Sequence, residues 1–117
     1  MVSLRKARTL ALDLPGTVEA DHWGHPSYRV AGRIFATAPD PSHLNVMIDP
    51  FEVEAVVRDE PDACGELRWG KDVRGVRVDL GHASAELLGN LLEAEWRRKA
   101  PRRLLATGQG EGSRRHR

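Results

Sequence analysis

The chain has 117 residues, 40% hydrophobic and 30% charged, which is typical of one globular domain. Its single cysteine, Cys64, excludes an internal disulfide and favours a reducing compartment. No apolar run reaches the roughly 18 residues that a membrane helix needs, and the N-terminus lacks a secretory signal, so we expect a cytoplasmic protein with no membrane association.

The net charge is only +1, but the charges are unevenly distributed along the chain. Residues 97–117 carry eight Lys or Arg and one Glu, whereas residues 1–96 carry ten Lys or Arg and sixteen Asp or Glu. A basic C-terminal end on an acidic body indicates a polyanionic partner.

A first helix is predicted from an N-cap at Ser3 to about Asp13, where Pro15 and Gly16 stop it. Its apolar residues recur at spacings of three and four, which places them on one face. They are Leu4, Ala7, Leu10, Ala11 and Leu14.

Two short strands joined by a tight turn at Ala31-Gly32 form the centre of the predicted sheet. Apolar and polar residues alternate in residues 28–30, and residues 34–37 are the antiparallel partner. A weaker strand is predicted at residues 17–22, followed by a turn at residues 23–26.

The middle of the chain is predicted to hold a loop, a strand and a second helix. Residues 38–42 contain two prolines and are expected to be a loop. Residues 44–48 show the clearest alternation of apolar and other residues and are predicted to be a strand. Asp49 is a good N-cap for a helix that begins with Pro50 and that Pro61 bounds.

The last third of the chain is predicted to end in a long helix. Residues 62–75 are expected to be a loop with a short strand at residues 67–69, and residues 76–80 to be a strand. A helix with an apolar face starts after Ser84 and stops at Pro101.

The predicted order is therefore α-β-β-β-β-α-β-β-α, which indicates an α+β fold with an antiparallel sheet and helices packed on one face. We expect one domain over residues 1–106 and a disordered basic tail over residues 107–117, whose Gly, Ser and Arg composition cannot form a core.

The main candidate site is the cluster of cations where the last helix ends. Some of them are expected simply to stabilise the helix dipole, but five in seven residues exceed that role and indicate phosphate contacts. The predicted nucleic-acid-binding residues are Arg97, Arg98, Lys99, Arg102, Arg103, Arg33, Arg77 and Lys71. Arg29 and Arg74 are near predicted strands and are candidates to extend this patch. For Arg29 the alternative is a side chain that lines the core.

The remaining candidate groups favour structural roles. His22 and His25 lack further ligands at metal-binding spacing, so we expect no metal and no cofactor. No serine or cysteine nucleophile pairs with a base, so we expect no enzyme. Of the aromatic residues, Trp96 is expected in the core, whereas Trp69 lies beside an exposed Gly70-Lys71 turn and is a candidate for base stacking.

Six motifs in order resemble the MmcQ/YjbR family of small bacterial proteins over residues 4–104. They are residues 10–16 (LALDLPG), 25–30 (HPSYRV), 32–36 (GRIFA), 69–70 (WG), 76–80 (VRVDL) and 96–104 (WRRKAPRRL). The resemblance implies a CyaY-like, or frataxin-like, fold and a DNA-binding role, and it brings no catalytic residues. Glu95 departs from the small residue common in the family at that position. Iron binding of the frataxin type is not expected, because the first helix carries Arg5, Lys6 and Arg8 instead of carboxylates.

The sequence thus predicts a monomeric, non-enzymatic protein that binds DNA through its basic C-terminal end with little sequence selectivity, because no recognition helix or zinc motif stands out. The alternative is a protein-interaction or small-ligand module that meets its partner through the sheet face or the loop at Trp69.

Overall fold

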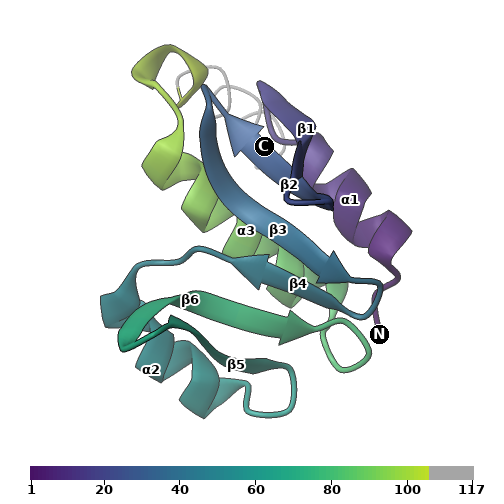
Figure 1. The fold of residues 1–117 in the computed structure, drawn as a ribbon, viewed down its shortest axis with the longest axis vertical. Helices are drawn as coiled ribbons and strands as arrows, with labels where there is room; N and C mark the ends of the chain where they lie inside the picture. The colour runs from purple at the N-terminus through teal and green to yellow at the C-terminus, as the bar shows by residue number, and fades with distance from the viewer. Residues whose placement is uncertain (106–117) are drawn as a thin grey trace, which may run out of the picture.

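The computed structural model describes residues 1–105, and the predicted tail at residues 107–117 lies outside them. Three helices and six strands follow in the predicted order (Figure 1). Their bounds are α1 Leu4–Leu12, β1 Thr17–His22, β2 His25–Val30, β3 Arg33–Asp40, β4 His43–Val46, α2 Pro50–Asp59, β5 Cys64–Trp69, β6 Asp72–Asp79 and α3 Ala85–Lys99. The strands form one antiparallel sheet in the order β1-β2-β3-β4-β6-β5, which confirms the α+β architecture.

Each helix begins at the N-cap that the sequence predicts. The Oγ atoms of Ser3 and Ser84 accept hydrogen bonds from the backbone N–H groups three residues later, and Asp49 Oδ1 accepts one from Phe51 N, all at 3.0 Å. These side chains satisfy N–H groups that have no partner inside the helix. The three helix starts are therefore set locally.

The predicted hairpin is confirmed as β2–β3, but β2 lies next to the edge strand β1 and not at the centre of the sheet, and it is longer than predicted. Ala31 and Gly32 both have positive φ, 51° and 79°, as a tight turn between antiparallel strands requires. Of the turn predicted at residues 23–26, only residues 23 and 24 form a turn, and residues 25 and 26 belong to β2. Pro26 is tolerated there because it lies opposite Asp21 of β1, before pairing with β3 begins at Ser27.

The prediction of a loop at residues 38–42 is wrong for residues 38–40, which belong to a strand. β3 continues to Asp40 and includes Pro39, and only the residues after Asp40 form the turn to β4. The register between β3 and β4 shifts between Thr37 and Asp40, and such an irregularity accommodates a proline without an N–H donor.

The loop predicted at residues 62–75 is a β-hairpin. β5 and β6 meet at a turn of Gly70 and Lys71, where Gly70 has a φ of 64°. The alternation of apolar and polar residues does not predict the full length of these two strands, because Gly65 and Gly75 interrupt it and a register shift follows Leu67. β5 lies at the edge of the sheet, so much of it is exposed and carries little hydrophobic signal.

The helices and the sheet enclose one hydrophobic core. Tyr28, Ala36, Val46 and Val76 lie side by side across four strands and are all buried. α3 lies behind β3 and β4 in Figure 1 and adds Trp96, whose Nε1 donates to the Pro15 carbonyl at 2.8 Å. This bond ties the end of α3 to the link between α1 and β1.

Among residues 1–105, no helix combines the length and the apolar character that crossing a membrane requires.

The central strand β4 is shorter than its neighbours, which opens the sheet at one end. β4 has four residues, whereas β3 and β6 have eight each. Val46, the last residue of β4, pairs with Ala36 and Val76, so the first residues of β3 and β6 continue beyond it without a strand between them. Residues 47–49 leave the sheet through this gap towards α2.

Gly75 is required where the chain passes through the gap, and Gly75→Ala is expected to destabilise the fold. A Cβ atom there would lie 2.2 Å from the Val46 carbonyl oxygen and 2.9 Å from Met47 Cα, both backbone atoms. Overpacking of this kind costs about 1–3 kcal/mol or more. Urea denaturation measures the loss, and Gly65→Ala is the control because nothing lies within 4 Å of its added Cβ. Equal stability of the two variants would contradict the close approach at Gly75.

Candidate nucleic-acid interface

A cavity of about 580 Å³ lies at the end of the sheet where β4 stops. Ile34 of β3, Met47 and Ile48 of the segment after β4, and Val73 of β6 line it with apolar groups. Ile48 is buried, and Ile34, Met47 and Val73 are half-buried. The short β4 therefore creates a hollow with an apolar lining.

Cations from separate parts of the chain converge on this cavity. Lys71 and Arg74 come from the β5–β6 hairpin, and Arg98 and Lys99 come from the last turn of α3. Lys71, Arg98 and Lys99 are predicted binding residues, and Arg74 is one of the possible extensions of the patch. The structure thus brings together cations that lie about 25 residues apart in sequence.

Glu95 holds two of these cations in place. Its side chain is 1% exposed, and it accepts a hydrogen bond from Arg98 Nη1 at 2.8 Å and another from Lys99 Nζ. Lys99 Nζ also lies 3.4 Å from the Met47 carbonyl oxygen. A buried carboxylate needs such partners, so Glu95 orients both cations and also cancels part of their charge.

The other predicted cations at the end of α3 are exposed. Arg97 forms an ion pair with Glu93, one turn earlier, at 2.9 Å. Exposed pairs of this type contribute about 0–1 kcal/mol, so Glu93 does not prevent a phosphate from contacting Arg97. Arg102 and Arg103 lie on a short helical turn after α3, and Arg33 is the exposed first residue of β3, next to Ile34 of the cavity.

Arg77 and Arg29 do not join this cluster. Arg77 Nη2 lies 3.3 Å from Asp40 Oδ2 and lines a different, smaller hollow of about 240 Å³. Arg29 is half-buried, donating from Nε to Ser27 Oγ at 3.0 Å and from Nη2 to the Asp21 carbonyl at 3.3 Å. Arg29 is therefore held by hydrogen bonds within the sheet, as a structural role requires, but it does not line the core.

Trp96 is buried and Trp69 is exposed, as the sequence predicts. Trp96 is 1% exposed and belongs to the core, whereas Trp69 is 55% exposed at the rim of the cavity. The Arg74 guanidinium lies over the Trp69 ring, 5.3 Å from its centre, and forms an ion pair with Asp72 at 3.5 Å. The exposed ring is thus held from one side by a cation.

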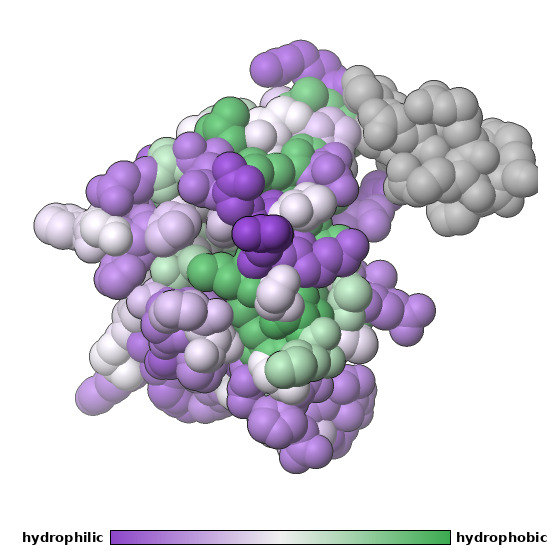
Figure 2. Space-filling view, turned by 90° about the vertical axis from the view of Figure 1, so that its right-hand side faces the viewer, coloured by the Kyte–Doolittle hydropathy of each residue, from purple (hydrophilic) through white to green (hydrophobic). Residues whose placement is uncertain are grey.

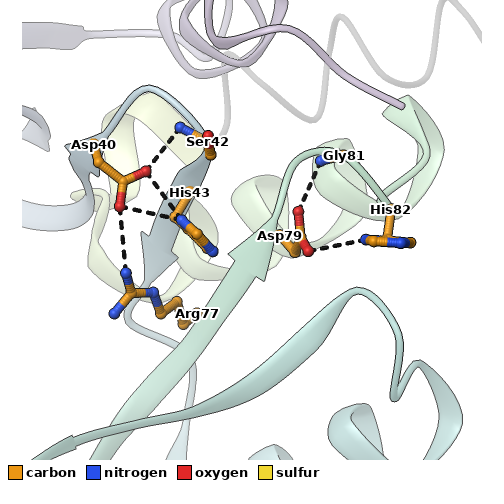
Figure 3. A network of polar contacts seen from close by, with 7 residues as sticks. All are labelled: Asp40, Ser42, His43, Arg77, Asp79, Gly81 and His82. Carbon is orange, nitrogen blue, oxygen red and sulfur yellow. Dashed lines mark hydrogen bonds and ion pairs between the residues drawn. The ribbon is translucent and has the colours of Figure 1, made fainter.

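A second polar cluster lies at the other end of β4 (Figure 3). The Asp40 carboxylate accepts from Ser42 N at 2.7 Å and contacts His43 Nδ1 at 3.0 Å, and Arg77 approaches its other oxygen. Asp79 accepts from Gly81 N and contacts His82 Nδ1, both at 2.9 Å. These bonds, the histidine contact first in each case, hold the pKa values of both carboxyls below the usual 3.8.

The low pKa values of Asp40 and Asp79 predict a specific loss of stability in acid. Their contribution is complete above pH 3.8 and disappears as the pH falls through the lower folded pKa values, because the unfolded chain then binds more protons. The double variant Asp40→Asn, Asp79→Asn is expected to take up fewer protons on unfolding in this range, because it lacks both carboxyls with lowered pKa values. Urea denaturation between pH 5 and pH 3 measures this, and an unchanged pH profile would contradict the role of the two bonds.

Figure 2 views the side of the molecule on which the β3–β4 and β6–α3 turns lie. Hydrophilic residues cover most of this face, and apolar residues are visible in a hollow between them. Within residues 1–105, no three His, Cys, Asp or Glu side chains are placed to hold a metal ion.

The cavity and the role of Glu95 are not among the features that the sequence predicts. The cavity results from the unequal lengths of three strands, and the hairpin that supplies Lys71 and Arg74 lies where the sequence predicts a loop with one short strand. Glu95 did carry a signal, because it is a carboxylate on the apolar stripe that includes Leu91, Leu92 and Trp96. Three and four residues later stand Arg98 and Lys99, the spacing at which helical side chains pair.

Comparisons with known proteins agree with the fold. A family model described as YjbR matches residues 12–98. The crystal structure of Deinococcus radiodurans protein DR2400, described with a domain DUF419, is similar with a TM-score of 0.69 and 24% identity, over 82% of this chain and 77% of that chain. No curated protein matches the chain. Because the match to the YjbR model covers most of this chain, the chain belongs to the YjbR family.

Proposed function

We propose that this YjbR protein is a non-enzymatic nucleic-acid-binding protein, with DNA as the expected ligand. The observation that carries the proposal is the convergence of Lys71, Arg74, Arg98 and Lys99 around one cavity. They outnumber the two carboxylates that they contact, Asp72 and Glu95. Arg33, Arg102 and Arg103 are further exposed cations, and they stand one to four residues from Ile34 or Lys99 of the cavity lining.

Binding of this kind draws its free energy mainly from the phosphate backbone. Each phosphate that a Lys or Arg neutralises releases a condensed counterion, so affinity falls steeply with salt. Contacts to phosphates position a protein without reading the sequence. The acidic remainder of the chain repels the polyanion, and this favours an approach through the cation-rich end.

The single cysteine of the chain is not a candidate nucleophile. Cys64 is buried at the start of β5, and burial, with a smaller effect of Glu60, raises its pKa to about 11. The thiol therefore stays protonated at neutral pH and is a weak nucleophile.

A salt titration with a labelled oligonucleotide tests the proposal. Fluorescence anisotropy at salt concentrations between 50 and 200 mM is expected to give a slope of log affinity against log salt of about −4 to −5 if five phosphates are contacted. Undetectable binding at low salt, or binding that does not change with salt, would contradict the proposal.

The cavity also favours a second candidate, a small anionic ligand with an apolar part. The volume of about 580 Å³ lies within the range of small-ligand pockets, about 300–1,000 Å³. A thermal-shift panel of nucleotides and anionic metabolites distinguishes this candidate. A large rise in Tm with one metabolite, together with no binding of oligonucleotides, would favour the small ligand.

A further inference from the structure

The lining of the cavity combines the two chemistries that an unpaired nucleotide presents. Ile34, Met47, Ile48 and Val73 provide an apolar surface, and Trp69 provides an exposed aromatic ring at the rim. Lys71, Arg98 and Lys99 provide donors for phosphate beside it. A base has an apolar face and a phosphate is anionic, so a nucleotide matches both surfaces at once.

Trp69 is placed as a stacking platform. It is the last residue of β5, directly before the Gly70-Lys71 turn, and 55% of its side chain is exposed. Arg74 lies over the ring, 5.3 Å from its centre, and also forms an exposed ion pair with Asp72. The contact with Arg74 favours one orientation of the ring, and this reduces the entropy that stacking would otherwise cost.

Glu95 fixes the phosphate-binding groups in the same way. Its buried carboxylate contacts Arg98 and Lys99 together, and these are the two α3 residues that line the cavity. The side chains of Arg98 and Lys99 are 45% and 22% exposed, so both remain accessible to a ligand while they contact Glu95.

An unpaired base can enter this cavity, whereas a base in a duplex cannot do so without leaving its stack. Extracting a base from a duplex costs a few kcal/mol, and a single strand avoids most of that cost. The cavity has room for a base, because its volume lies in the range that accommodates small ligands. The geometry therefore distinguishes single strands from duplexes.

We propose that the cavity takes an unpaired base of a single-stranded nucleic acid, stacked on Trp69, with the adjoining phosphates on Lys71, Arg98 and Lys99. This inference rests on the proposed nucleic-acid-binding function and specifies its substrate class. It assigns the remaining cations, such as Arg102 and Arg103, to phosphates further along the strand.

The test compares a single-stranded oligothymidylate, a duplex of equal length and an abasic single strand, with Trp69→Ala and a matched control. Wild-type protein is expected to bind the oligothymidylate most tightly. Trp69→Ala is expected to weaken that binding about 5- to 150-fold, from a stacking contribution of about 1–3 kcal/mol, and to leave the salt slope unchanged. The same substitution is expected to change neither duplex nor abasic binding, and Trp69→Phe to retain most of the affinity.

Trp23→Ala is the matched control, because Trp23 is 87% exposed and does not line the cavity. Its affinities are expected to equal those of the wild type, and circular dichroism verifies that each variant folds. Equal affinity for single strands and duplexes, with no effect of Trp69→Ala, would overturn this inference and leave the proposed function intact. Absence of binding to any of the three probes at low salt would overturn both.

Discussion

Trp96→Ala is expected to reduce the free energy of unfolding by about 3–5 kcal/mol, the range for removing a large buried aromatic side chain. Trp96 is 1% exposed and is among the largest fully buried side chains. Its Nε1 donates to the Pro15 carbonyl at 2.8 Å, so the substitution also leaves that carbonyl without this donor. Urea denaturation followed by circular dichroism measures the loss.

Two variants separate the contributions at Trp96. Trp96→Phe keeps an aromatic ring in the core but loses the bond to Pro15, so its expected cost is smaller than that of Trp96→Ala. Trp23→Ala is expected to stay within about 0.5 kcal/mol of the wild type, because Trp23 is 87% exposed. Equal effects of Trp96→Ala and Trp23→Ala would show that α3 does not pack as described.

Neutralising four exposed cations at the proposed interface is expected to remove most of the salt dependence of nucleic-acid binding. The quadruple variant carries Gln at Arg33, Lys71, Arg102 and Arg103 and leaves the contacts of Glu95 intact. Each lost phosphate contact flattens the salt slope by about 0.9 for a duplex and about 0.7 for a single strand, so the four together reduce it by about 3 to 4. Fluorescence anisotropy at several salt concentrations measures the slope.

A second quadruple variant controls for net charge. It carries Gln at Arg5, Lys6 and Arg8 of α1 and at Arg58 of α2, all exposed, and none lines the cavity. It loses the same number of positive charges, so a purely global effect of charge would make the two variants equal. We expect the control to keep a slope close to that of the wild type, and equal slopes would contradict a localised interface.

The element order was predictable from the sequence because its signals are local. Ser3, Asp49 and Ser84 cap their helices through side-chain bonds within three residues, and Ala31-Gly32 sets the turn between β2 and β3. Strand ends were less predictable, because pairing with neighbours decides them. Pro39 lies inside β3 only because the register shifts there.

The cations were predictable as a set, but their arrangement was not. Composition identifies the basic end of the chain, and the helical spacing of Arg98 and Lys99 places them on adjacent faces of α3. That Lys71 lies beside them depends on the β5–β6 hairpin and on the early end of β4, which are tertiary features. Arg77 alternates with buried residues of β6, and this pattern predicts that its side chain is exposed. The pattern does not predict that Arg77 lies beside Asp40, away from the cavity.

The central claim is that polyanions bind where α3 ends and β4 stops. The most direct measurement is the change in backbone amide chemical shifts when the protein is titrated with a short oligonucleotide at low salt. We expect the changes to concentrate at residues 33–34, 47–48, 69–74 and 98–103. Changes concentrated at residues 40–43 and 77–82, or no changes at all, would contradict the claim.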